Sequence, residues 1–498
     1  MTLSSKNVVM IAVMLVFCTL IPSFAHATSK ETMNKIDHFI EKQQALSKIP
    51  GLSVVIVAKG ETVYQKGFGF ADLKTKTPVT SDTLFELGST SKAFTGLAIL
   101  QLEKQGLLKR SDDVRKYIPW LTLAYNEKKQ VITIQQLLSH TSGIPSSSIA
   151  RIPESTADNA LELTVKTLLD QPLNRKPGSS FEYATINYDV LGLVIEQLSN
   201  QPFDQYIKQK ILEPIGMHHS FVGIHQAPST AMASGYKIGL MGEQPYTPPV
   251  YRGNIPAGYI ISDTNDIARW LKFQLGNSDV YSIENKVIRE SHAPDKTVEP
   301  FDTNTYYANG WAVVEKNKQQ YIYHAGENPT FTSYFIMQPD EQIGVAILAN
   351  MNTSFTTAIG QGVMDLWEGN TIQDQHVSSY QKLDKIVTIV SAIVIAISMI
   401  FCYLLFRGVH SLFKKQRCVA KLTYKKIILL SVHIGLVVIL LTMIFFAPNM
   451  LLGGLNWTFI KVWAPTSISV LLYSIILTSV LFLFVGITLI VTKKKVQS

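Results

Sequence analysis

Two hydrophobic periodicities alternate along the first three quarters of the chain. Residues 31–46 repeat apolar side chains at a helical spacing, and Pro50-Gly51 ends that helix. Residues 52–57 and 62–70 alternate as strands, and Lys59-Gly60 between them predicts a hairpin turn. Near the end of this part the strand alternation returns four times and a helix follows: 309–314, 320–324, 332–337, 343–349 and then 355–367.

The segment between these strands, residues 107–200, reads as mostly helical, with turns at Gly143-Ile144-Pro145 and Pro177-Gly178. Helices inserted between early and late strands predict one sheet built from both ends of the segment. We therefore expect residues 28–375 to form an α/β (α+β) domain, with a mixed, mainly antiparallel sheet covered by helices.

The last quarter of the chain has a third pattern, that of membrane helices. Three apolar segments without charged side chains are each long enough to cross a bilayer: 386–406, 427–446 and 467–491. A linker, 376–385, would precede them. A basic loop (407–426), a second loop (447–466) and a tail (492–498) would complete this part.

The N-terminus carries the features of a secretory signal peptide. Lys6, an apolar run over 8–21 and the small-x-small signal Ala25-His26-Ala27 place it at residues 1–27, with an uncleaved anchor as the alternative. Basic residues gather in the loop 407–426 and in the tail, which the positive-inside rule assigns to the cytoplasm. We expect a multi-pass protein of the bacterial cytoplasmic (inner) membrane, with residues 28–385 on the extracytoplasmic, periplasmic side.

The net charge of +8 reflects this topology. Residues 386–498 hold eleven of the 45 basic residues and none of the 37 acidic ones, so the rest of the chain is slightly acidic. That distribution argues against nucleic acid as a partner and favours the lipid bilayer. The three cysteines, Cys18, Cys402 and Cys418, lie outside the exported part, and no metal-ligand spacing occurs, so we expect no disulfide there, no metal and no cofactor.

Candidate chemistry centres on Ser89-Thr90-Ser91-Lys92. A serine hydroxyl needs a nearby base, and a lysine three residues later lies on the same helical face. Burial would lower the pKa of Lys92 and leave part of it neutral, while free N–H groups at a helix start could stabilise an oxyanion. Alone, this tetrapeptide is more often a helix cap.

Two further stretches can complete a site: 181–188, which contains Tyr183, and 323–329, which contains His324. Each alone is weak, since Tyr183 could be a packed core aromatic and His324 a residue at a strand end. Together with Ser89 and Lys92, in this order, they are a strong signal.

These motifs resemble those of the serine β-lactamase and penicillin-binding superfamily, in its class-C-like branch. Matching stretches run from about residue 47 to 352 and include Leu137-Leu138-Ser139-His140-Thr141-Ser142-Gly143 and Ala233-Ser234-Gly235-Tyr236. The resemblance implies a β-lactamase-like fold with Ser89 as nucleophile, Lys92 as base and Tyr183 as proton relay. It also implies an oxyanion hole from the backbone N–H groups of Ser89 and Glu327, beside His324 and Gly326 on the substrate-binding strand.

Two motifs depart from the branch. Tyr183-Ala184-Thr185 replaces Tyr-x-Asn, and His324-Ala325-Gly326 replaces Lys-Thr-Gly. Both alter the pocket that meets a β-lactam carboxylate, so we do not expect efficient penicillin hydrolysis.

Further stretches are similar to membrane-bound prodrug-activating D-asparaginyl peptidases of the colibactin, zwittermicin and xenocoumacin maturation type. They are 183–192, 324–331, 348–352 and 454–460, together with the signal peptide and the three C-terminal helices. Such enzymes remove an N-acyl-D-asparagine cap from an exported precursor. By motif position, Glu86, Thr185, Asn254 and Asn328 would bind the asparagine amide. The alternatives are a helix-entry charge for Glu86, a turn residue for Asn254 and an Asn-Pro turn for Asn328.

Two alternative functions would use the same catalytic residues. One is a cell-wall D-alanyl hydrolase, either a D-Ala-D-Ala carboxypeptidase or a teichoic acid D-alanyl esterase. The other is a β-lactam receptor that is acylated without turnover. The three helices could be a simple anchor. Alternatively, they could pack together, bind the acyl chain of an acylated, peptide-like small-molecule substrate or contact a prodrug exporter. Trp457, Trp463 and Pro465 in the loop favour these further roles.

Overall fold

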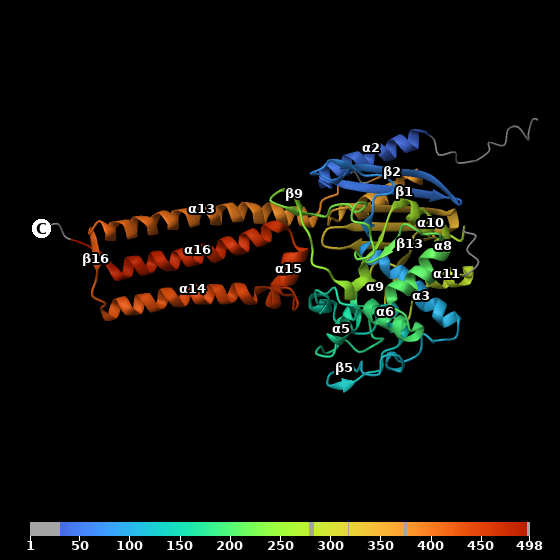
Figure 1. Ribbon diagram of the computed structural model, residues 1–498, viewed down its shortest axis with the longest axis horizontal. Helices are drawn as coiled ribbons and strands as arrows, with labels where there is room; N and C mark the ends of the chain where they lie inside the picture. Colours follow the sequence, from blue (N-terminus) through green and yellow to red (C-terminus); the bar gives the residue numbers. More distant parts are fainter. Residues whose placement is uncertain (1–29, 278–282, 317, 373–375, 496–498) are drawn as a thin grey trace, which may run out of the picture.

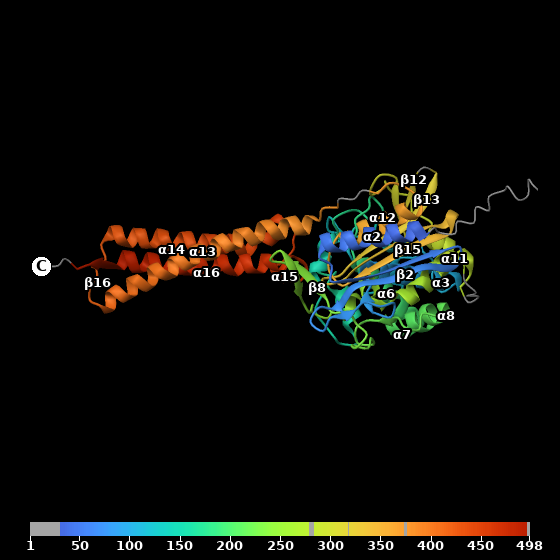
Figure 2. The same cartoon turned by 90° about the horizontal axis from the view of Figure 1, so that it is seen from above.

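The computed structural model describes residues 30–277, 283–316, 318–372 and 376–495, so the expected signal peptide lies outside the described residues. A globular part holds the N-terminal helix, the sheet and its covering helices (Figure 1). Three long helices leave this part side by side, and the C-terminus lies at their far end (Figures 1 and 2).

The main sheet has eight strands in the order β11-β12-β13-β14-β15-β1-β2-β3, and every printed ladder in it is antiparallel. Its centre joins the two ends of the globular part, because β1 pairs with β15 from Leu52 opposite Ala349 to Ala58 opposite Ile343. The expected sheet built from both ends is confirmed. Its strands are β1 (Gly51–Ala58), β2 (Glu61–Asp72), β3 (Thr77–Pro78), β11 (Thr305–Ala308), β12 (Trp311–Lys316), β13 (Gln319–Glu327), β14 (Thr332–Gln338) and β15 (Ile343–Ala349).

The turn between β1 and β2 falls where the sequence predicts it. Lys59 and Gly60 both have positive φ, 51° and 82°, as a two-residue hairpin turn that follows the strand twist requires.

Alternate side chains of β1 enter two separate cores. Val54 and Ile56 pack with helices α2 (Lys30–Ser47) and α12 (Phe355–Trp367) on one face. Val55 and Val57 belong to the larger core on the other face. Because successive side chains of a strand point to opposite faces, this sheet is covered on both sides.

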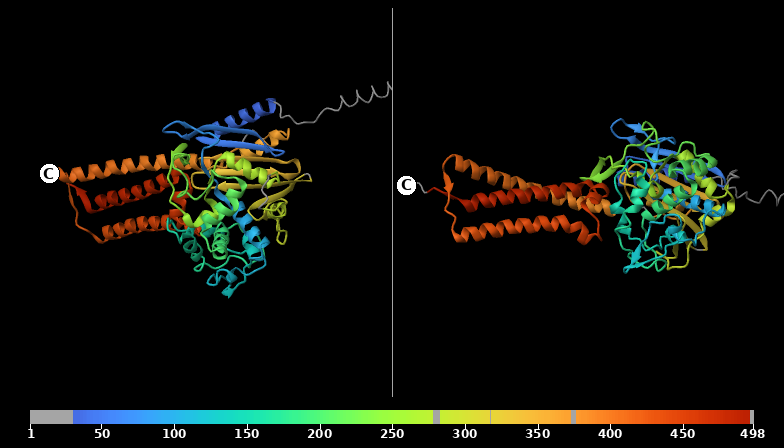
Figure 3. Two further views of the ribbon diagram at one scale, coloured as in Figure 1. Left: turned by 45° about the vertical axis from the view of Figure 1, so that its right-hand side comes forward. Right: turned by 60° about the horizontal axis from the view of Figure 1, so that its bottom comes forward.

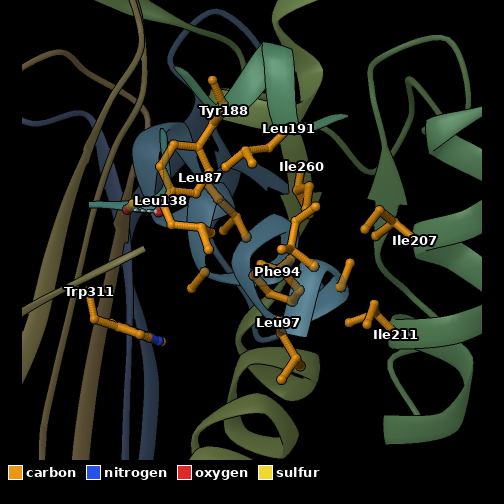
Figure 4. Packing of buried hydrophobic residues seen from close by; sticks show 14 of the residues in the cluster. Leu87, Phe94, Leu97, Leu138, Tyr188, Leu191, Ile207, Ile211, Ile260 and Trp311 are labelled. Carbon is orange, nitrogen blue, oxygen red and sulfur yellow. Dashed lines mark hydrogen bonds between the residues drawn. The ribbon is translucent and has the colours of Figure 1, made fainter. Parts of the chain in front are cut away.

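Helix α3 (Lys92–Lys104) runs through the larger core and is buried almost all round. Figure 4 shows Phe94 and Leu97 of α3 surrounded by apolar side chains of other elements. The Phe94 ring stacks on Trp270 at a centroid distance of 3.8 Å. The start of this helix, where Ser89 lies, is therefore fixed by packing along its whole length.

The prediction of a mostly helical segment over 107–200 is wrong. Only α6 (Ile186–Ser199) is longer than two turns there, and the remaining described elements are short: η2 (Val114–Lys116), β5 (Ala124–Tyr125), β6 (Lys128–Lys129), α4 (Ile134–Leu138), η3 (Ser146–Arg151) and α5 (Ala160–Lys166). Apolar residues such as Leu121, Leu123 and Ile144 lie on irregular backbone, yet their side chains are buried. The spacing of such residues along the sequence resembles that of a helix.

The remaining elements of the globular part carry the connections around the sheet. They are β4 (Phe85–Glu86), η1 (Gly88–Ser91), α7 (Phe203–Ile207), η4 (Lys208–Leu212), α8 (Glu213–Ile215), β7 (Phe221–Val222), β8 (Tyr236–Gly239), β9 (Gly242–Pro245), η5 (Arg252–Asn254), α9 (Ile255–Gly258), β10 (Ile260–Ser262), α10 (Thr264–Gln274), α11 (Asn285–Ser291) and η6 (Pro339–Glu341).

The C-terminal part contains three helices that are long and apolar enough to cross a membrane: α13 (Ser379–Phe413), α14 (Tyr424–Leu451) and α16 (Thr466–Val491). Helix α13 begins inside the segment expected as linker, so that stretch is mostly helical. Between α14 and α16 a short helix, α15 (Trp457–Trp463), lies against the globular part, and β16 (Arg417–Val419) pairs with β17 (Thr492–Lys494) at the opposite end (Figure 1).

Candidate active site

Ser89 lies in the turn η1 that leads into α3, where the backbone comes unusually close to strand β13. Gly88 has φ +57°, and a Cβ atom on it would lie 2.5 Å from the backbone nitrogen of Glu327. A Cβ atom on Gly326 would lie 2.0 Å from the carbonyl oxygen of Leu87. Only glycine fits at these two positions. The approach places the turn of Ser89 beside the end of β13, where the N–H groups of Ser89 and Glu327 are the expected oxyanion donors.

Lys92 is fully buried beside Ser89. Its Nζ atom lies 2.9 Å from Ser89 Oγ, 3.0 Å from Thr185 Oγ1 and 2.7 Å from the carbonyl oxygen of Ala257. Burial lowers the pKa of Lys92 to about 7, although the charge of Asp189 opposes the shift. A neutral amine can donate to Thr185 and Ala257 and still offer its lone pair to the Ser89 hydroxyl, so the geometry suits a general base.

Tyr183 presents its phenol to the same site from the loop before α6. Its ring lies beside the buried His140 ring, with centroids 4.3 Å apart. Burial raises the pKa of the Tyr183 phenol, and the nearby Ser89 hydroxyl lowers it only in part. A phenol that stays protonated can donate its proton to a leaving group, but it is seldom deprotonated and is therefore a poor general base.

Thr185 takes the place that the resembling branch gives to asparagine. Its Oγ1 atom accepts from Lys92, so the hydroxyl supplies the lysine with a polar partner. The departure at this position therefore keeps a contact to the base and shortens the side chain that faces the cavity.

A buried carboxyl group, which the motif reading did not single out, lies behind the lysine. Asp189 is fully buried in α6, and burial raises its pKa well above the ordinary value. With its amide nitrogen turned toward this carboxyl group, Asn254 donates to both oxygens at 3.0 and 2.9 Å. The signal in the sequence was a charged residue next to the apolar run 190–195 of the same helix.

Glu86 and Asn328 form a second buried pair. Asn328 Nδ2 donates to Glu86 Oε2 at 2.7 Å and to the carbonyl oxygen of Gly258 at 2.9 Å. Burial raises the pKa of Glu86 to about 7, and the bond from Asn328 opposes this shift. Both hydrogens of the amide are engaged, so Asn328 can offer a ligand only its oxygen Oδ1.

His324 is a neutral residue of the site. Its Nε2 atom lies 2.9 Å from the Tyr307 hydroxyl, and its Nδ1 atom lies 2.7 Å from the carbonyl oxygen of Ala325. Burial and the nearby Lys92 lower the pKa of His324 to about 3. The strand that carries lysine in the resembling branch thus carries no positive charge here.

A cavity of about 450 Å³, called the Ser89 cavity below, joins most of the predicted residues. Ser89, Tyr183, Thr185, Asn254, His324, Glu327 and Asn328 line it. Lys92 and Gly326 lie behind its wall, and Glu86 lines a separate cavity of about 220 Å³. The other lining residues are mostly apolar: Ile149, Phe181, Ala257, Gly258, Phe301, Tyr307, Ala312, Tyr323, Ala325 and Trp463.

Trp463 is the residue of this wall that comes from the C-terminal part with the three long apolar helices. It ends helix α15, between the second and third apolar helices. The sequence indicates that this tryptophan lies in an outside loop but cannot place it at the cavity, because the contact joins two distant parts of the chain.

Within the part of the chain that the structure describes, no group of three or more His, Cys, Asp and Glu side chains is arranged to hold a metal ion.

Fold and site together define a β-lactamase-like protein of the penicillin-binding kind, with a mainly antiparallel sheet, covering helices and a half-buried serine beside a buried lysine. The family model for beta-lactamase matches residues 36–361, and the chain belongs to this family, whose members are generally serine hydrolases.

Three known proteins illustrate the similarity. Protein flp of Staphylococcus aureus strain N315 is 30% identical over 477 residues, which cover 92% of this chain and 93% of its own. PbpX of Bacillus subtilis, which carries the name of a penicillin-binding protein, is 36% identical over 223 residues, 44% of this chain and 54% of its own. The octameric penicillin-binding protein homologue from Pyrococcus abyssi superposes with a TM-score of 0.61 at 27% identity, covering 71% of this chain and 81% of its own.

Proposed function

We propose that this protein is a membrane-bound, extracytoplasmic serine peptidase that removes an N-acyl-D-asparagine cap from an exported natural-product precursor. The observation that carries this proposal is that Ser89 and Trp463 line one cavity. A serine suited to acyl transfer thereby lies next to a segment that joins two helices able to cross a membrane.

Acylation begins with proton transfer from Ser89 to neutral Lys92, at the 2.9 Å contact between them. The freed Oγ attacks the carbonyl carbon of the D-asparagine residue, and the resulting oxyanion is stabilised by the N–H groups of Ser89 and Glu327. Tyr183 donates its proton to the leaving amine and regains one from the Lys92 ammonium. The carbon–nitrogen bond breaks, and the N-acyl-asparaginyl group remains on Ser89.

Deacylation repeats these steps with water. Lys92, again neutral, accepts a proton from the water by way of the Tyr183 hydroxyl, and the resulting hydroxide attacks the ester carbon. The Ser89 oxygen leaves and takes the proton back. The products are the mature amine, released first, and an N-acyl-D-asparagine.

Recognition of the asparagine side chain would fall to the polar groups of the cavity. Asn328 Oδ1 can accept from the substrate amide, while Thr185 and Asn254 line the same cavity as further partners. Glu86 fixes the orientation of Asn328 and acts from behind the wall. A site that pairs both ends of an amide rejects substrates that lack it.

The apolar side chains that line the cavity suit a long acyl chain. Ile149, Phe301 and Trp463 offer apolar surface, and a chain that partitions into the bilayer would reach them from the membrane side. The basic strands β16 and β17 lie at the end of the helices far from the globular part, so the positive-inside rule favours an extracytoplasmic cavity.

The test is cleavage of N-myristoyl-D-Asn anilide by the detergent-solubilised full chain. The L-Asn and D-Ala analogues run in parallel, and Ser89→Ala is the blank. Turnover restricted to D-Asn and abolished by Ser89→Ala supports the proposal. Preference for D-Ala would instead favour the cell-wall D-alanyl hydrolase, the candidate that the similarity to PbpX supports.

A further inference from the structure

Helix α15 is held against the globular part at both ends. Its N-cap residue Asn456 donates from Nδ2 to the carbonyl oxygen of Ala150 at 3.2 Å, next to Ile149 of the cavity wall. Trp457 at its start donates to the carbonyl oxygen of Ile444 in α14 at 2.9 Å. Its last residue, Trp463, lines the Ser89 cavity.

The other end of α15 is capped by a buried lysine from the globular part. Lys237 of strand β8 is 3% exposed. Its Nζ atom donates to the carbonyl oxygens of Lys461 at 2.9 Å and Val462 at 2.8 Å, and it lies 4.4 Å from the centre of the Tyr246 ring. The last carbonyl groups of a helix lack partners within the helix and carry partial negative charge. A lysine at this end therefore supplies them with hydrogen-bond donors and a favourable charge.

The hairpin that carries Lys237 is itself fixed to the long helices. Asp384 of α13 is buried and accepts from the backbone N–H groups of Leu240 at 3.1 Å and Met241 at 2.7 Å, in the turn between β8 and β9. A Cβ atom on Gly239 would lie 2.6 Å from the Thr466 side chain at the start of α16. The hairpin thus lies at the junction between the globular part and the helices, as Figure 3 also shows.

We propose that Lys237 is a positioning residue that holds α15, and with it Trp463, against the Ser89 cavity, and thereby sets how well the enzyme accepts long apolar acyl chains. This inference rests on the proposed function only in assuming an acyl substrate. Lys237 does not line the Ser89 cavity, so it acts through the two carbonyl groups next to Trp463.

The physical argument predicts a selective effect. Without the ammonium group, two buried carbonyl groups lose their donors, and α15 is released at the end that carries Trp463. Ser89 and Lys92 are held by α3 and its core, which Lys237 does not contact. A long chain that needs Trp463 should therefore bind less tightly, whereas a short acyl group should not sense the change.

The experiment compares para-nitrophenyl acetate and myristate as substrates of the full chain in lipid nanodiscs. For Lys237→Met we expect KM for the myristate to rise about tenfold, while kcat for both esters and KM for the acetate stay within about twofold. Lys237→Arg should restore most of the myristate KM, because a guanidinium can reach both carbonyls. In the double variant with Trp463→Ala, Lys237→Met should add nothing further.

Lys48→Met is the matched control, because Lys48 donates to the Met241 carbonyl of the same hairpin but does not touch α15. It should leave both esters unchanged. Labelling of Ser89 by a fluorophosphonate at the wild-type rate checks that each variant is folded. Should Lys237→Met fail this check, Tyr246→Leu, which removes only the ring beside the ammonium, must raise the myristate KM in the same direction.

Equal losses on both esters, no loss on either, or additivity with Trp463→Ala would overturn the proposal. Because these esters contain no asparagine, this outcome is independent of the D-Asn specificity. A wild-type enzyme that cleaves the esters but not N-myristoyl-D-Asn anilide would refute the proposed function and leave the role of Lys237 to be decided by the ester data.

Discussion

Two unlike groups of side chains meet at the Ser89 cavity, and they are called its polar half and its apolar half below. On the polar side, Lys92 makes three hydrogen bonds within the protein and is fixed by a helix that is buried almost all round. On the apolar side, Ile149, Phe301 and Trp463 come from three separate segments, one of them between two helices that are long and apolar enough to cross a membrane. Under the proposed function, the polar half would perform the same chemistry on many acyl compounds, whereas the apolar half would select among them. Variants should therefore separate reaction rate from substrate choice.

The largest effect is expected from the polar half. Ser89→Ala should abolish turnover of every substrate, and Lys92→Met should lower kcat by roughly 10³-fold or more, because the serine loses its base. Steady-state kinetics with a short and a long acyl ester measure both variants. A Lys92→Met enzyme with near wild-type kcat would show that another group activates Ser89.

Tyr183→Phe should affect the cleavage of an anilide, which releases an amine, more than the cleavage of a nitrophenyl ester, which releases nitrophenolate. An anilide amine needs a proton as it departs, while nitrophenolate does not, so kcat for the anilide should fall about 10²-fold and kcat for the nitrophenyl ester much less. Parallel assays of an anilide and an ester with the same acyl group test this. Equal losses would place Tyr183 in serine activation instead of proton delivery to the amine.

Trp463→Ala tests the apolar half. Loss of the indole surface should raise KM for a myristoyl substrate by about tenfold and leave an acetyl substrate unaffected. The measurement is the ratio of the two KM values, with Trp367→Ala, at the end of α12 and outside the cavity lining, as the matched tryptophan control. If Trp463→Ala lowers kcat for both substrates, the two halves are not separable.

The smallest effect concerns pH. With Lys92 as base and its pKa at about 7, kcat/KM should rise as pH increases through that value. The charge of Asp189 favours the ammonium form, so Asp189→Asn should lower the pKa of Lys92 further and move the rising limb to lower pH. Profiles of kcat/KM for a short ester check the direction. An unmoved limb would indicate that Asp189 is uncharged beside Lys92.

Parts of the site were readable from the sequence because their signals are local. The pair Ser89 and Lys92 lies within one turn, and the helix expected over 355–367 coincides with α12. The segment 107–200 was misread because buried side chains on irregular loops repeat at nearly helical spacing. Helix α13 extends into the segment expected as linker, where Asp384 interrupts the apolar run and its carboxylate accepts from two N–H groups of the β8–β9 hairpin.

By itself the sequence determined the kinds of element, the family motifs and three segments able to cross a membrane, since these depend on neighbouring residues and on hydrophobicity. Tertiary structure alone decided that Thr185 contacts Lys92, that Glu86 stands behind Asn328, and that Trp463 lines the same cavity as Ser89. These contacts join positions far apart in the chain. Their existence depends on how helices and sheet pack, which no local pattern of residues encodes.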